Sequence, residues 1–280
     1  MNNQLDKGTP MTSWLTRLFL SAALAVVFVP SAMAYSGSYT PGTGINGTVH
    51  DLATNHDGLT YAADPSDAPL NRICIYCHAP HNTYRLSTAT GGAGPQAPSE
   101  YDYLPLWNHM LPGTTPVYTM YENGDGAPQT GSKALQEEAT APGGVSLLCL
   151  SCHDGAIAVN SYGNSAQLSA SVSNPSNTNT RISNQYLVGK DYYLGNHHPI
   201  GFKWSDVEGV DQEIRDADTH FLTPSTTVRD HLYGMDEKME CATCHSVHNK
   251  GNGGERLLWR SDQSSQLCLT CHDKGIYVDP

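Results

Sequence analysis

The sequence predicts a chain of mostly irregular structure with short helices and few short strands. It contains 26 glycines and 17 prolines, and charged residues make up only 15% of the chain. Glycine and proline favour turns and interrupt regular elements. Long amphipathic helices are therefore not expected, and short strands are expected only in the tyrosine-rich stretches near 115–122 and 186–194.

Residues 1–34 read as a secretory signal peptide. Lys7 and Arg17 precede an apolar run over residues 18–29, and residues 32–34 (Ala-Met-Ala) match an A-x-A cleavage site. The apolar run is shorter than the roughly 20 residues that a membrane-spanning helix needs, and no later run approaches that length. We therefore expect an exported protein, periplasmic or extracellular, without a membrane span.

The chain is acidic. Loss of residues 1–34 removes Lys7, Arg17 and Asp6, so that 15 basic and 27 acidic residues become 13 and 26, a net charge of −13. Such a surface is a poor match to nucleic acid, which binds cationic surfaces. It favours solubility and docking to basic partners.

All eight cysteines fall into four C-x-x-C pairs, and a histidine directly follows each pair. On a helical turn, positions i, i+3 and i+4 share one face, so two thiols and one imidazole can reach the same group. This is the spacing of c-type haem attachment. Disulfides, zinc sites and thioredoxin-like motifs do not require the trailing histidine. The predicted attachment residues are Cys74, Cys77, Cys149, Cys152, Cys241, Cys244, Cys268 and Cys271, and the proximal iron ligands are His78, His153, His245 and His272.

The four motifs are of two alternating kinds. Residues 74–82 (CIYCHAPHN) and 241–249 (CATCHSVHN) carry a second histidine three residues after the first, and we call them the doubled-histidine motifs. Residues 146–159 (SLLCLSCHDGAIAV) and 265–278 (SQLCLTCHDKGIYV) share the pattern S-x-L-C-L-S/T-C-H-D. The alternation predicts that a two-haem unit has been duplicated.

The predicted units follow the signal peptide 1–34. The first covers residues 35–160 and the second residues 161–280, with a Ser- and Asn-rich linker over 162–183. Four haems would supply much of the core that so loop-rich a chain lacks. We therefore expect a multihaem cytochrome c whose scaffold is a stack of haems.

The second histidines of the doubled-histidine motifs, His81 and His248, start on the same side of their haem as its proximal histidine. They are therefore expected to bind the iron of a different haem. We pair His248 with the fourth haem and, by the repeat, His81 with the second. His50 and His198 then serve the first and third haems, so that every iron has two imidazoles.

Other side chains are alternatives at these positions. His109 is an alternative to His50, and His197 is an alternative to its neighbour His198. Methionine ligation would raise the reduction potential, although free histidines outnumber the positions to be filled. The methionines in question are Met110, Met120, Met235 and Met239. The remaining histidines, His56, His220 and His231, are expected to be solvated or hydrogen-bonded.

The chain resembles the multihaem cytochromes with doubled C-x-x-C-H motifs from metal-reducing and sulfur-cycling bacteria, through the succession VHDL, CIYCHAPHN, LPLWNH, SLLCLSCHDG, HHPIGF, CATCHSVHN and SQLCLTCH over residues 49–273. That group includes periplasmic and outer-surface tetrahaem proteins, some of which polymerise into haem-stacked filaments. The resemblance implies bis-histidine haems. Its proximal ligands would be His78, His153, His245 and His272, and its distal ligands His50, His81, His198 and His248.

These observations predict a protein with four covalent haem c groups that transfers electrons in anaerobic respiration and is not an enzyme. With two protein ligands on every iron, no coordination position is open to a substrate. Expected partners are other cytochromes, redox proteins, metal oxides and, in a filament, further copies of the chain. One alternative is a multihaem reductase in which one haem keeps an open axial position, and another is a sensor or structural module.

Overall fold

The computed structural model describes eight segments, all within one compact unit, Gly37–Pro280. They are residues 44–52, 72–90, 94–121, 141–159, 161–163, 181–182, 184–250 and 257–280. The predicted signal peptide, His56 and most of the predicted linker lie outside the described residues.

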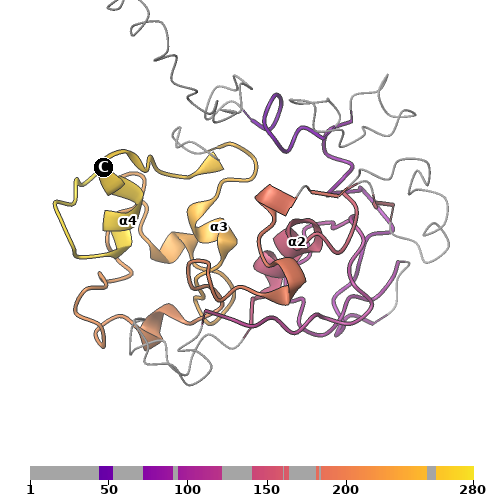
Figure 1. Ribbon diagram of the computed structural model, residues 1–280, viewed down its shortest axis with the longest axis horizontal. Helices are drawn as coiled ribbons and strands as arrows, with labels where there is room; N and C mark the ends of the chain where they lie inside the picture. The colour runs from indigo at the N-terminus through magenta and orange to yellow at the C-terminus, as the bar shows by residue number, and fades with distance from the viewer. Residues whose placement is uncertain are drawn as a thin grey trace, which may run out of the picture. The chain divides into compact units, whose positions relative to one another are not determined.

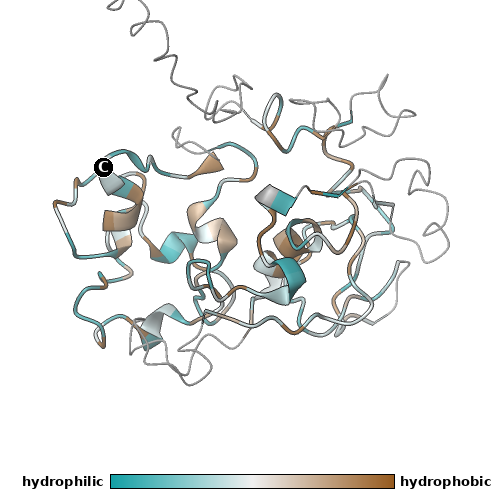
Figure 2. Cartoon of the chain, viewed as in Figure 1, coloured by the Kyte–Doolittle hydropathy of each residue, from teal (hydrophilic) through white to brown (hydrophobic). Residues whose placement is uncertain are grey.

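The described helices are short, and three of them contain a cysteine motif or part of one (Figure 1). They are α2, Gly144–His153, α3, Cys241–Cys244, and α4, Gln266–Cys271. Apolar residues are prominent in α2 and α4 (Figure 2). Single 3₁₀ turns occur between them: η2, Asn184–Tyr186, η3, Lys190–Tyr192, η4, Trp204–Asp206, η5, Arg229–His231, and η7, Gln263–Ser265. Within the described part of the chain, none of the helices has the length and apolarity to cross a bilayer.

The two tyrosine-rich stretches pair with each other, but through a single parallel bridge, Thr119–Tyr193, instead of the expected strands. Thr119 accepts a hydrogen bond from Leu194 N–H and donates its own N–H to the carbonyl of Tyr192, both at 2.8 Å. Asp191 and Tyr192 have φ angles of 56° and 60°. This left-handed backbone cannot continue a strand, and so the ladder ends after one bridge.

Buried apolar side chains form two main clusters. The first contains Leu147, Leu148 and Leu150 of α2, packed with aromatic residues such as Tyr101 and Trp107. It also includes Leu194, which lies beyond residue 160. The second cluster contains Phe202, Trp204, Ala217, Phe221, Val228 and Met239. The division into two-haem units at 160/161 therefore stays a proposal, since the first cluster draws on residues of both.

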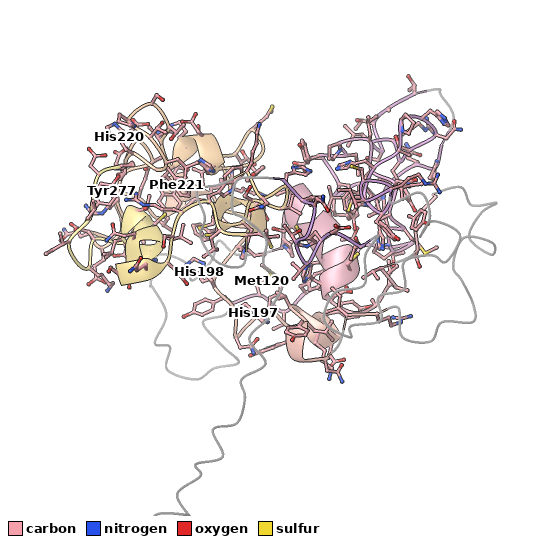
Figure 3. The ribbon with its side chains drawn as sticks, turned by 90° about the horizontal axis from the view of Figure 1, so that it is seen from above. Met120, His197, His198, His220, Phe221 and Tyr277 are labelled. Atoms are coloured by element: carbon pink, nitrogen blue, oxygen red, sulfur yellow. The ribbon has the colours of Figure 1, made fainter. Side chains whose placement is uncertain are left out.

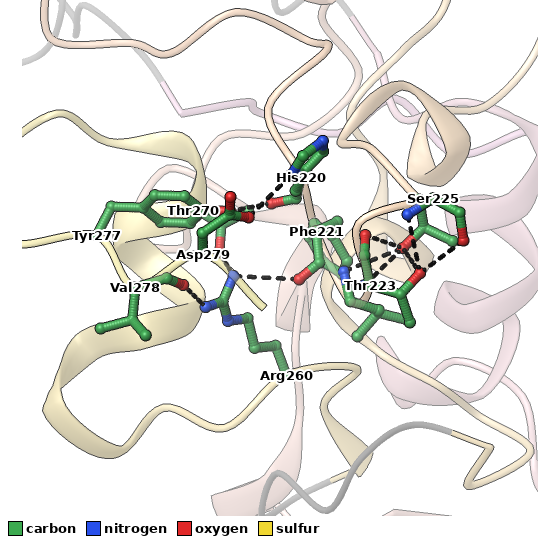
Figure 4. A network of polar contacts seen from close by, with 11 residues as sticks. His220, Phe221, Thr223, Ser225, Arg260, Thr270, Tyr277, Val278 and Asp279 are labelled. Atoms are coloured by element: carbon green, nitrogen blue, oxygen red, sulfur yellow. Dashed lines mark hydrogen bonds and ion pairs between the residues drawn. The ribbon is translucent and has the colours of Figure 1, made fainter.

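The C-terminal residues are held by a buried arginine (Figure 4). Arg260 is 6% exposed, and its guanidinium donates hydrogen bonds to the Phe221 carbonyl (3.1 Å), to the Thr270 hydroxyl (3.0 Å) and to the Val278 carbonyl. The same guanidinium lies 5.2 Å from the ring centroid of Tyr277. Since the cation connects Phe221 of the second cluster to Thr270 of α4 and to Val278, it ties the chain end to that cluster.

Replacing Arg260 by Met should lower the free energy of unfolding of the protein by about 2–4 kcal/mol, because the carbonyl of buried Phe221 and the hydroxyl of buried Thr270 lose their donor. Urea denaturation followed by far-ultraviolet circular dichroism measures this change. Lys203→Met is the matched control, since Lys203 pairs with Asp236 at 3.3 Å with both side chains largely exposed. Equal losses in the two variants would contradict a special role for Arg260.

Candidate haem-binding site

One backbone hydrogen bond shapes three of the cysteine motifs. The N–H of the motif histidine donates to the carbonyl of the first cysteine, which is one turn of α-helix. These bonds join His78 to Cys74 (2.9 Å), His245 to Cys241 (3.1 Å) and His272 to Cys268 (2.9 Å). The remaining motif lies inside α2 and ends with its last residue, His153. In each motif the two thiols and the imidazole therefore leave the same turn, as the spacing predicts.

Each of the same three motifs is contacted by the backbone of another segment of the chain, in the same way each time. An isolated antiparallel bridge joins each motif histidine to a distant residue, and the pairs are His78–Trp107, His245–Leu258 and His272–Ile214. The residue after each partner donates its N–H to the carbonyl of the second cysteine: Asn108 to Cys77 (2.8 Å), Trp259 to Cys244 (2.9 Å) and Arg215 to Cys271 (2.8 Å). Sequence reasoning missed these partners because a backbone contact leaves no common side-chain pattern.

Three pairs of the predicted ligands face each other at nearly equal separations. The ring centroids are 6.0 Å apart in His50–His153, 6.1 Å in His78–His248 and 6.2 Å in His198–His272. Figure 3 shows His198 next to helix α4. Two imidazoles that bind one metal ion from opposite sides, each through a nitrogen about 2 Å from it, have centroids about 6 Å apart. The three separations therefore fit an iron between each pair.

The arrangement of these three distal histidines differs from the expected pairing. His248 lies opposite His78 of the first motif, not opposite His272. His50 lies opposite His153 instead of His78, and His198 lies opposite His272 instead of His245. The expectation used distance along the chain, whereas the chain reverses after His248 and returns to its own motif through the His245–Leu258 bridge.

His81 is exposed, and its Nδ1 lies 3.4 Å from the side-chain amide of Asn82. Asn82 has a φ angle of 58°, and Asn249, the corresponding residue after His248, has a φ angle of 51°. Asparagine tolerates this left-handed conformation better than most residues. The shared H-N pair of the doubled-histidine motifs therefore reflects a shared turn.

The protonation of the paired histidines suits a metal site. Burial, and secondarily the neighbouring His153, lowers the pKa of His50 to about 3, and burial lowers the pKa of His153 to about 4. Both imidazoles are neutral at pH 7, which is the form that binds a metal. Their Nδ1 atoms are buried and have no hydrogen-bond partner among the described residues.

The other two pairs contain an imidazole oriented by a backbone carbonyl. Nδ1–H of His78 donates to the Pro105 carbonyl (2.6 Å), and Nδ1–H of His198 donates to the Pro199 carbonyl (2.9 Å). Such a bond fixes the tautomer and leaves Nε2 free to bind a metal. The residues present therefore fit haem iron.

Motifs that follow one another in the sequence also have thiols that lie close together in space. A hydrogen bond between the thiols of Cys149 and Cys241 raises the pKa of the first and lowers that of the second. Burial, and secondarily Cys77, raises the pKa of Cys152. Burial and the nearby Cys244 likewise raise the pKa of Cys271 to about 12. The motifs thus lie in a series, with the second next to the first and to the third, and the fourth next to the third.

Two histidines outside the imidazole pairs, the alternative ligand His109 and the remaining histidine His231, have structural partners. His109 is buried, its Nε2–H donates to the Ala158 carbonyl (3.0 Å), and its Nδ1 lies 3.2 Å from the Ser151 hydroxyl. His231 stacks on Phe221 with ring centroids 4.0 Å apart. These contacts occupy both nitrogens of His109 and give His231 a packing role.

The remaining candidates differ in exposure. Nδ1 of His220 lies 2.8 Å from the Asp279 carboxylate at the surface. His197 is half-buried beside the exposed His198. Met120 and Met239 are buried in the two apolar clusters, whereas Met235 is fully exposed. Packing alone therefore explains the two buried methionines.

A buried carboxyl lies between the second and third motifs. Glu240 is 1% exposed, and it accepts hydrogen bonds from Gly143 N–H (2.9 Å) and from the Ser146 hydroxyl. Burial outweighs these hydrogen bonds and raises the pKa of Glu240 to about 7. Gly143 and Ser146 lie at the start of α2, and Glu240 directly precedes α3, so this carboxyl connects the two helices.

Comparison with known proteins gives one family match. The model of the doubled CXXCH motif matches residues 235–276, which contain the third and fourth motifs. No curated protein matches the chain. The CXXCH motifs indicate covalently bound haem c, and the doubled motif is typical of electron-carrying cytochromes.

The stability of the holoprotein should fall as the pH rises through 7. The folded-state pKa of Glu240, about 7, lies above the ordinary value of 4.5, so its contribution is complete below about pH 4.5 and is lost as the buried carboxyl ionises. We expect a loss of about 2–3 kcal/mol between about pH 5 and about pH 8. Urea denaturation across this range, with Glu240→Gln as the non-ionising control, measures it. Equal pH dependence in both proteins would exclude Glu240 as the source.

Proposed function

We propose that the chain is an exported tetrahaem c-type cytochrome that carries electrons along four haems, each with two histidine ligands. The observation that carries this proposal is the set of three imidazole pairs at 6.0, 6.1 and 6.2 Å, each of which contains one motif histidine. In each pair, the separation of the two imidazoles is the one that a shared metal ion requires.

The geometry supports ligand assignments for three haems. The first haem, on Cys74 and Cys77, has His78 and His248. The second, on Cys149 and Cys152, has His153 and His50. The fourth, on Cys268 and Cys271, has His272 and His198.

For the third haem, on Cys241 and Cys244, we propose His245 and His81. The two doubled-histidine motifs have the same turn after their second histidine, as the φ angles of Asn82 and Asn249 show. His248 of the third motif faces His78 of the first. If the two doubled-histidine motifs exchange their second histidines, His81 of the first motif binds the same iron as His245 of the third. All eight predicted iron ligands then have a place.

Bound haem supplies one-electron chemistry through the ferric and ferrous states of its iron. The chain supplies two imidazoles to each iron, which leaves no position for a substrate, and this favours electron transfer over a reductase. The neighbouring thiols of successive motifs support a route that runs from the first site to the fourth. A haem-stacked scaffold made of two two-haem units is the corresponding fold.

The location and partners are part of the same proposal. The signal sequence supports export to the periplasm or the cell exterior. The acidic surface supports docking to basic redox partners, and other cytochromes and metal oxides are the proposed electron partners. The most specific part of the proposal is that the chain polymerises into an extracellular filament, which the resemblance supports.

The purified mature protein should have a mass equal to that of the chain from Tyr35 plus four haems. Its low-temperature electron spin resonance spectrum should contain only low-spin ferric signals, because every iron has two imidazole ligands. A colourless protein or a smaller mass increment would refute the tetrahaem cytochrome. A high-spin signal with ready binding of carbon monoxide would favour the reductase instead.

Adjacent histidines offer a matched test of ligation. His198→Ala should convert one of the four haems to a high-spin form that binds carbon monoxide, because His198 lies opposite His272. His197→Ala should leave all four low-spin. The spin count of each variant is read from the same resonance spectrum, and the reverse outcome would assign the ligand to His197.

A further inference from the structure

The start of α2 receives a side chain from the second half of the chain. Oε1 of Glu240 accepts the N–H of Gly143, the residue before α2, and Oε2 accepts the hydroxyl of Ser146. The Glu240 and Ser146 side chains are almost completely buried, at 1% and 0% exposure. A buried carboxyl with these contacts stabilises the end of α2 at which N–H groups lack helical partners.

The same carboxyl also caps α3. Glu240 is the N-cap residue of α3, where its side chain accepts the Thr243 N–H while its own N–H donates to the Thr243 hydroxyl (2.9 Å). This reciprocal arrangement is a capping box. The Ser146 hydroxyl oxygen in turn accepts the N–H of Cys241 (3.0 Å). One closed network therefore connects the first turns of α2 and α3.

The contact requires a glycine for reasons of space. A Cβ atom at position 143 would lie 2.1 Å from Oε1 of Glu240. Gly143 has φ −81° and ψ 177°, a conformation that any residue adopts. Position 143 therefore requires glycine because a side chain would collide with the Glu240 carboxyl, and not because of its backbone conformation.

Both helices carry the first cysteine of a motif next to this network. Ser146 and Cys149 are three residues apart on α2 and so share a face, and Cys241 directly follows Glu240. The thiols of Cys149 and Cys241 are hydrogen-bonded to each other. Glu240 thus connects the two helix starts that lie next to these two attachment points.

We infer that Glu240 is a positioning residue that holds the second and third haem sites at a fixed separation and so sets the rate of electron exchange between them. This inference rests on the proposed function, because it assumes a haem at each of the two sites. Lys238 and Asp102 are the charged groups that act on Glu240. Asp102 also approaches the start of α2 at Gly144, but its side chain is exposed.

The experiment compares holoproteins whose mass shows four haems and whose resonance spectrum is entirely low-spin. Electron exchange is followed after a photoreduction pulse, and the coupling of neighbouring haems is followed by circular dichroism in the Soret band. Glu240→Ala should slow exchange severalfold and alter the Soret couplet, because electron transfer between two haems falls steeply as their separation grows. Glu240→Gln retains the shape and the acceptor for Gly143, and it should stay close to the unsubstituted protein.

One control separates positioning from general disturbance. Gly113→Ala adds a Cβ atom where no atom lies within 4 Å, and it should leave exchange and the couplet unchanged. If Glu240→Ala matures with fewer than four haems, Ser146→Ala, which removes the hydroxyl contacts of Ser146 with Glu240 and with the Cys241 N–H, takes its place with the same direction of change expected.

An alanine variant that has four low-spin haems together with an unchanged exchange rate and couplet would overturn the inference. Haem content and spin state of the unsubstituted protein test the proposed function separately. If the inference about Glu240 fails, the unsubstituted protein still has four low-spin haems. If the proposed function fails, it does not.

Discussion

The helical turn that joins each motif histidine to its first cysteine is the constraint on which the rest of the structure depends. It brings two thiols and one imidazole to one side of the backbone in only five residues. Such a turn is too short to be stable alone. Each of three motifs is therefore completed by a distant segment, and the repeated bridges to Trp107, Leu258 and Ile214 show the same solution applied three times.

This arrangement explains why a chain with so few regular elements can have a defined structure. The bridges are made by backbone groups, so loops without regular secondary structure can still satisfy their hydrogen bonds on the motifs. Buried apolar residues form clusters around α2 and around the loop that contains Trp204 and Phe221. The Glu240 network connects the first of these regions to α3 through polar contacts.

The sequence was informative where chemistry depends on local spacing. The motif turns and the alternation of two motif kinds could be predicted because they involve residues within a few positions of one another. The histidine pairing could not be predicted, since His248 and His78 are far apart in the sequence and only tertiary contacts bring their rings together. The tyrosine-rich stretches also misled, because the positive φ angles of Asp191 and Tyr192 interrupt a strand that their side chains favour.

Asn249 also holds the segment that contains His50. Its side-chain amide donates to the Gly44 carbonyl (2.8 Å), and its own carbonyl accepts the Gly44 N–H (3.4 Å). These two residues are 205 positions apart in the chain. During synthesis, the early segment can therefore take up its place beside His153 only after most of the polypeptide has been made. The contact between His50 and His153 is thereby tied to a residue far along the chain.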